Sequence, residues 1–88
     1  MLDALRFVVR ALCRSEFAVR ISGGSARLVR GKLRARVVDD FAAIARSRGI
    51  EGGSILGVAR PGRGTVLVFS PGIADADRQR FRNAFAAA

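Results

Sequence analysis

The chain follows the same local pattern twice, at an offset of forty residues. In each copy, an alternating apolar segment, a glycine-containing turn and a second alternating segment precede a stripe of apolar residues at helical spacing. Two strand–turn–strand–helix units predict two hairpins, which combine most simply into one sheet. We therefore predict an α+β fold. It has an N-terminal helix and then two ββα units, with a four-stranded antiparallel sheet and the helices packed on one face.

The predicted element boundaries follow from apolar spacing and from turn residues. Gly49 is the residue type that commonly ends a helix in the left-handed conformation. Glycines at residues 22–25 and 61–64 suit tight turns, because glycine reaches positive φ without steric cost. We expect strands at residues 17–21, 26–30, 54–60 and 65–70, and helices at residues 34–47 and 74–86.

Residues 1–15 predict an amphipathic helix, with Leu2 and Leu5 beginning an apolar stripe and Arg6, Arg10 and Arg14 on another face. The segment has no apolar run of the ~20 residues that a bilayer span requires, and no secretory signal. We expect the helix to pack on the sheet, with peripheral contact to an anionic membrane as the alternative. Residues 16–88 then form a single ββαββα domain, expected in the cytoplasm.

The residue inventory excludes several kinds of functional site. The chain has 88 residues, no His, Trp or Tyr, and one Cys. These counts exclude a disulfide scaffold, a Cys/His zinc site and an imidazole-dependent catalytic triad. Asp39 and Asp40 point about 100° apart on a helix, so they do not converge on one ion, and Arg36 is spaced to pair with each. We expect no catalytic residues, no metal and no cofactor.

The positive charge is concentrated in the first part of the chain. Sixteen Lys and Arg against seven Asp and Glu give a net charge of +9, and residues 1–36 alone carry nine basic and two acidic residues, a net +7. A localised basic surface indicates an anionic partner, and nucleic acid is the first candidate. The predicted contact residues are Arg20, Arg27, Arg30, Lys32, Arg34 and Arg36.

Two interpretations of these cations remain open. If Phe17, Val19 and Ile21 face the helices, Ala18 and Arg20 lie on the other face of the sheet, where arginines would contact a phosphate backbone. No Tyr or Trp is present for base stacking, so such contacts would have little sequence specificity. Alternatively, the charges protect a hairpin edge from unwanted pairing. The module would then self-assemble, or dock on a protein partner or membrane surface, through the N-terminal helix and the sheet edges.

Several short motifs carry a resemblance to a known family. They are Gly31-Lys32, Ile44-Ala-Arg46, Arg48-Gly49, Ile55-Leu-Gly57, Phe69-Ser-Pro-Gly-Ile73 and Gln79-Arg-Phe-Arg-Asn83. Through them the chain resembles a small bacterial family of uncharacterised proteins, a domain of unknown function whose members typically begin with a hydrophobic membrane anchor. This chain departs at that segment, which Asp3, Arg6 and Arg10 interrupt.

The resemblance implies no reaction or ligand, but it singles out a set of residues for a structural or docking role. On the last helix, polar residues beside Phe81 and Phe85 would either hold the helix against the sheet or form a docking surface. The set comprises Phe69, Ser70, Gly72, Ile73, Gln79, Arg80, Arg82 and Asn83.

Overall fold

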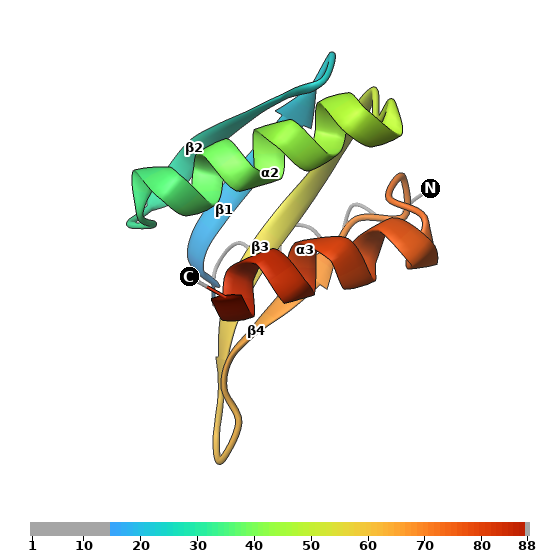
Figure 1. Ribbon diagram of the computed structural model, residues 1–88. Helices are drawn as coiled ribbons and strands as arrows, with labels where there is room; N and C mark the ends of the chain where they lie inside the picture. The colour runs from blue at the N-terminus through green and yellow to red at the C-terminus, as the bar shows by residue number, and fades with distance from the viewer. Residues whose placement is uncertain (1–14, 88) are drawn as a thin grey trace, which may run out of the picture.

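The computed structural model describes residues 15–87 of the chain. The elements are β1 (Ser15–Ser22), β2 (Ser25–Gly31), α2 (Ala35–Arg48), β3 (Gly52–Arg60), β4 (Gly64–Phe69) and α3 (Asp75–Ala87). The strands form one antiparallel sheet in the order β2-β1-β3-β4, and Figure 1 shows α2 and α3 side by side over it. The predicted α+β class with a four-stranded antiparallel sheet is confirmed. The helix predicted for residues 1–15 lies outside the described residues, except that Ser15 begins β1.

The first hairpin turns at two glycines. Gly23 and Gly24 have φ of 54° and 77°, the pair of positive values that a type I′ hairpin turn requires. Its twist matches that of the flanking strands, so the turn brings β1 and β2 together without splaying them. The Ser25 hydroxyl donates a hydrogen bond to the carbonyl oxygen of Ser22 over 2.7 Å, which closes the turn.

Helix α2 ends where the sequence predicts. Gly49 adopts the left-handed conformation at φ 64° and ψ 35°, and the amide of Ile50 donates to the carbonyl oxygen of Ala45 over 2.9 Å. This pairing satisfies one of the carbonyl groups left open at a helix C-terminus. Arg46 and Arg48 in the last turn add positive charge at the negative end of the helix dipole. Neither α2 nor α3 is long and apolar enough to cross a membrane.

The hydrophobic core lies between the sheet and the two helices. Phe81 on α3 is its centre, because its ring packs edge-on against Phe41 of α2 at 5.2 Å and lies 6.0 Å from the ring of Phe69 on β4. Phe69 therefore points toward the helices and belongs to the core. The buried core comprises Phe17, Val19, Ile21, Val37, Phe41, Ala45, Ile50, Ile55, Leu67, Phe69, Ile73 and Phe81.

One close approach in the core depends on the absence of a side chain. The ring of Phe17 on β1 lies directly over the α-carbon of Gly57, its partner on β3, and a Cβ at that position would overlap the ring. The ring of Phe85 on α3 is 5.7 Å from that of Phe17. Gly57 therefore allows the Phe17 ring to lie close against the β3 backbone while its ring also contacts Phe85 near the end of α3.

The two edges of the sheet differ in chemistry. The β2 edge carries Arg27 and Arg30, and charged side chains of this kind discourage pairing with another strand. The β4 edge, Gly64–Phe69, reads GTVLVF and has no charged residue within the strand. Charge near this second edge comes instead from the turn before β4 and from α3.

Candidate anion-binding surface

Three of the six predicted cations share the face of the sheet that points away from α2 and α3, which we call the outer face. Arg20 on β1 is directly opposite Arg27 on β2, and Arg30 is opposite Ala18. Residues 27 and 30 are an odd number of positions apart, so a regular strand would direct them to opposite faces. The pairing register shifts between Ala18 and Val19. This β-bulge returns Arg30 to the face of Arg27.

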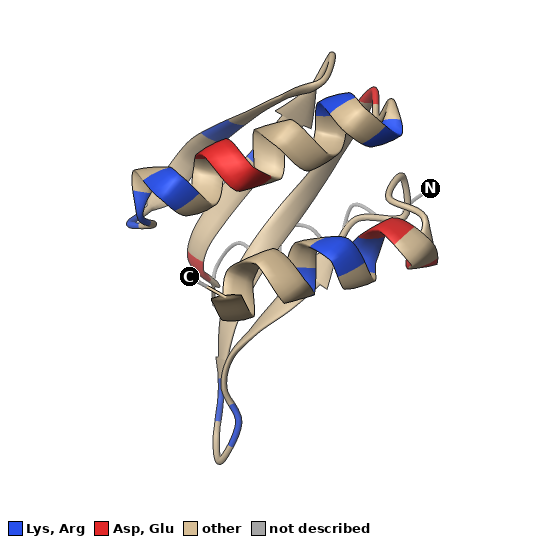
Figure 2. Ribbon diagram, viewed as in Figure 1, with Lys and Arg blue, Asp and Glu red and all other residues tan. Residues whose placement is uncertain are grey.

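The other three cations lie beyond the end of β2. Lys32 and Arg34 belong to the segment that joins β2 to α2, and Arg36 lies in the first turn of α2. Because α2 covers the opposite side of the sheet, the six cations do not occupy one face. They pass from the outer face, around the β2 edge, to the helix layer, and Figure 2 marks the positions of Lys and Arg in blue along the chain. We call these six exposed residues the basic band.

The basic band has no ion-pair partner within residues 15–87. The described ion pairs join Arg48 to Asp77 and Arg78 to Asp75, outside the band. The pairing predicted for Arg36 with the two aspartates that follow it on α2 is not formed among these contacts. Arg20 and Arg27 also carry like charges directly opposite each other, an arrangement that destabilises a strand pair. The band therefore carries positive charge that the described part of the protein does not neutralise.

The N-terminus of α2 adds to this positive potential. Its N-cap residue is Arg34, which makes no side-chain capping bond, and the first turn contains no acidic residue. A helix N-terminus already carries partial positive charge and favours anionic side chains. Arg34 and Arg36 thus lie at the end of the helix where cations are least favourable in the absence of an anion.

The centre of the outer face differs from the open platform that we predicted. Ala18 does lie on the face away from the helices, as expected, but it is only 2% exposed, and Leu56 beside it on β3 is 3% exposed. Arg60, on the same face as Leu56 by strand alternation, is exposed at the far end of β3, whereas Arg20, Arg27 and Arg30 lie on the β2 side of this face. Among them Val29 is 53% exposed. The surface available to a ligand is therefore a strip along the β1–β2 hairpin.

The first group of motif residues builds the turn from β4 into α3. The Ser70 amide donates to the carbonyl oxygen of Ser54 over 3.0 Å, and the Ser54 amide donates to the Ser70 hydroxyl over 2.9 Å. A Cβ at Gly72 would lie 3.3 Å from the carbonyl oxygen of Gly52, and Ile73 is buried in the core. Ser70 closes the turn, and Phe69 and Ile73 anchor its two ends.

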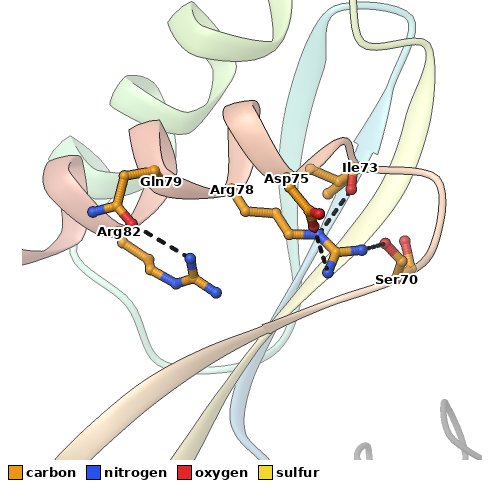
Figure 3. A network of polar contacts seen from close by, with 6 residues as sticks. All are labelled: Ser70, Ile73, Asp75, Arg78, Gln79 and Arg82. Carbon is orange, nitrogen blue, oxygen red and sulfur yellow. Dashed lines mark hydrogen bonds and ion pairs between the residues drawn. The ribbon is translucent and has the colours of Figure 1, made fainter.

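The second group lies on α3 and forms a chain of contacts along the helix. The Asn83 side chain accepts a hydrogen bond from Gln79 over 3.0 Å, and Gln79 accepts one from Arg82 over 3.4 Å. The guanidinium carbon of Arg82 is 5.3 Å from the centre of the Phe69 ring, which is cation–π distance. Figure 3 shows the Gln79–Arg82 contact and the Arg82 side chain reaching from α3 toward β4. Arg80 is exposed.

Sequence reasoning missed Arg78, which fastens α3 to the turn before it. Its Nε donates to the carbonyl oxygen of Ile73 over 2.8 Å and its Nη2 to that of Ser70 over 3.2 Å (Figure 3). Its Nη1 lies 3.4 Å from the Asp75 carboxylate. The spacing of Asp75 and Arg78 was visible in the sequence, but the two carbonyl partners depend on the path of the turn.

Sequence reasoning also missed the partner of Asp77. The Asp77 carboxylate accepts a hydrogen bond from Arg48 of α2 over 2.8 Å, and its side chain is only 12% exposed. The two residues are far apart in the sequence, so no local spacing could have indicated the pair.

Within residues 15–87, no group of three or more Asp, Glu or Cys side chains is arranged to hold a metal ion.

Comparison of the chain with known protein families, with curated proteins and with solved structures finds no match. A functional interpretation of this protein therefore rests on the geometry of its described residues.

Proposed function

We propose that this protein is a non-catalytic binding module that contacts the phosphate backbone of nucleic acid through the basic band. In this proposal the module consists of an N-terminal helix and two ββα units. The observation that carries the proposal is the direct opposition of Arg20 and Arg27 on adjoining strands, with no carboxylate partner among the described residues. Such a pair costs stability in the free protein, and a bound phosphate would remove that cost.

The shape of the basic band suits a backbone ligand better than a single small anion. Three arginines lie on the outer face and three further cations continue around the β2 edge. A chain of phosphates would meet several of these cations in succession, whereas one small anion would meet one or two. Because the described residues offer no exposed Tyr or Trp for stacking, we expect weak dependence on base sequence.

The test is fluorescence anisotropy of the full chain with labelled duplex DNA, single-stranded DNA and RNA, between about 50 and 300 mM salt. The variant R27Q/R30Q/R34Q removes three cations of the basic band. For duplex DNA the slope of log K against log salt is negative, and each lost phosphate contact reduces its magnitude by about 0.9. The triple variant should therefore lose more than about tenfold in affinity at 100 mM salt, and the magnitude of its slope should decrease by about two to three.

The matched control is R60Q/R63Q/R80Q, which changes the net charge by the same amount at exposed positions outside the band. It should retain most of the affinity of the unmodified chain. Equal losses in the two triple variants would mean that binding follows net charge alone. No binding by the unmodified chain at 50 mM salt would reject the proposal.

The alternative function is a module for protein interaction or self-assembly, working through the predicted N-terminal helix and the sheet edges. The apolar, uncharged β4 strand at one edge is the observation that favours it. Deletion of residues 1–14 separates the two functions. It should abolish assembly under the alternative, and it should leave nucleic-acid binding by the basic band largely intact under the main proposal.

A further inference from the structure

A groove runs along β4 on the side of the molecule away from β2. It has a volume of about 840 Å³ and is lined by Thr65–Val68 of β4, by Arg82 and Phe85 of α3, by Arg60 at the end of β3 and by Arg63 in the turn that follows. Figure 1 shows this turn projecting beyond the end of α3. Consecutive residues of β4 line the groove, although their side chains alternate between the two faces of the sheet. The groove therefore follows the exposed edge of the strand.

The backbone of β4 presents hydrogen-bonding groups to this groove. The Ser70 amide donates to Ser54 and so points toward β3. In an antiparallel ladder successive residues alternate in direction, so the amides of Val68 and Val66 also point toward β3. Those of Thr65 and Leu67 point away from the sheet, where the strand order places no further strand of the described chain. An extended segment could bind to these groups by strand addition.

The groove is basic at its rim and apolar at its floor. Arg60 and Arg63 lie at the end where β4 begins, and Arg82 lies over Phe69 at the other end. Leu67 and Phe85 lie between them, and the lining contains no acidic residue. These charges at both ends complement a ligand with two separated negative groups.

Arg82 is held in place before any ligand arrives. Gln79 accepts a hydrogen bond from its guanidinium, Asn83 holds Gln79, and the Phe69 ring lies 5.3 Å from its guanidinium carbon. A side chain that is already ordered loses less conformational entropy on binding than a free one. This gives the motif residues Gln79, Arg82 and Asn83 a shared role at the groove.

We infer that this groove binds an extended acidic segment of another protein, which adds to β4 as a fifth strand. Side chains two positions apart in a strand lie on the same face. A segment that fits this groove therefore has an apolar residue over Leu67 and Phe85. It also has one carboxylate residue two positions before that apolar residue and another two positions after it. The site lies at the opposite edge of the sheet from the basic band and does not depend on the proposed nucleic-acid binding.

Charge also argues against a second copy of this chain as the occupant. Pairing β4 with another β4 would bring Arg60, Arg63 and Arg82 of one copy close to those of the other. Each copy also has a net charge of +9. Nucleic acid would satisfy the arginines but would leave the outward amides of Thr65 and Leu67 without a strand partner.

The experiment measures the anisotropy of a labelled nine-residue peptide, acetyl-Gly-Thr-Asp-Val-Leu-Val-Asp-Thr-Gly-amide, with the full chain. A control peptide has Lys in place of both Asp residues. The acidic peptide should bind at least about tenfold more tightly, because it forms two additional ion pairs at the rim. The variant R60Q/R63Q should weaken its binding several-fold, whereas R27Q/R30Q/R34Q should retain it, even if nucleic-acid binding is lost.

A second pair of variants tests strand addition itself. T65P removes an amide that points out of the sheet, a place where an edge strand tolerates proline, and T65V is its matched control. Both lose the hydrogen bond from the Thr65 hydroxyl to Glu16, but only T65P loses the amide. We expect T65P to bind the peptide at least about fivefold more weakly than T65V.

Three results would overturn the inference. The first is equal affinity for the acidic and the Lys-containing peptides. The second is equal binding by T65P and T65V when circular dichroism shows both to be folded. The third is a dimer of the unmodified chain in analytical ultracentrifugation that T65P abolishes, because the occupant of the groove would then be a second copy. If T65P does not fold, the R60Q/R63Q result decides alone, and unchanged affinity in that variant also rejects the inference.

Discussion

Arg48 at the end of α2 donates a hydrogen bond to the Asp77 carboxylate at the start of α3, with 2.8 Å between Nε and Oδ1. The contact joins the two helices at one end of the layer that covers the sheet. Asp77 also lies in the first turn of α3, where a negative charge complements the helix dipole. The pair therefore helps to fix the position of the start of α3 relative to the end of α2.

Breaking this pair should destabilise the fold moderately. We expect D77N to lower the free energy of unfolding by about 1–2 kcal/mol, because Asp77 is mostly buried while Arg48 is partly solvated. A double-mutant cycle with R48Q, measured by urea denaturation, should give a coupling of about 1 kcal/mol. Strict additivity of the two substitutions would mean that the pair contributes nothing.

A side chain at Gly57 should destabilise the core. In G57A the new methyl group would overlap the ring of Phe17, which is buried and has little room to move. We expect a loss of about 1–3 kcal/mol, the usual cost of overpacking. The double variant G57A/F17L should lose less than the sum of the two single variants, because a smaller side chain at position 17 makes room for the methyl group. Urea denaturation of all three variants measures the difference.

Removing the Arg78 side chain should loosen the turn between β4 and α3. In R78Q the carbonyl oxygens of Ser70 and Ile73 lose charged hydrogen-bond donors, and we expect a loss of about 1–3 kcal/mol. R80Q is the matched control on the same helix, since Arg80 is exposed, and it should change stability by less than about 0.5 kcal/mol. Thermal denaturation of both variants tests this, and equal stability would contradict the role given to Arg78.

Neutralising Arg27 should raise stability while lowering nucleic-acid affinity. R27T removes one member of the opposed Arg20–Arg27 pair and introduces a residue that favours strands. We expect the Tm to rise by roughly 2–4 °C, which corresponds to about 0.5 kcal/mol in a domain of this size. R27K retains the charge and should leave both properties close to those of the unmodified chain. A stabilised variant with unchanged affinity would show that the pair is not part of the binding surface.

Local patterns in the sequence predicted most of the described fold. The alternation around Val19 placed β1, and the glycine at position 49 placed the end of α2 within one residue. Phe41 and Phe81, which correspond at the forty-residue offset, form an edge-on ring pair in the core. These features could be predicted from the sequence because strand alternation, helix periodicity and positive φ depend on residues only a few positions apart.

The candidate site was predicted only in part. All six cations of the basic band are exposed, but their division between the outer face and the helix layer was not visible in the sequence. Arg30 shares a face with Arg27 only because the register shifts between Ala18 and Val19. A β-bulge depends on how two strands align, so the alternation within one strand does not reveal it.

The sequence by itself determined the α+β class, the order of strands and helices between residues 15 and 87, and the excess of positive charge. Only the tertiary structure decided that Asp77 pairs with Arg48, that Phe17 lies over Gly57, and that β4 forms an open edge beside Arg82. The physical reason is the range of the interactions. Backbone conformation responds to neighbours within about one helical turn, whereas ion pairs, ring contacts and sheet edges depend on which distant segments the fold brings together.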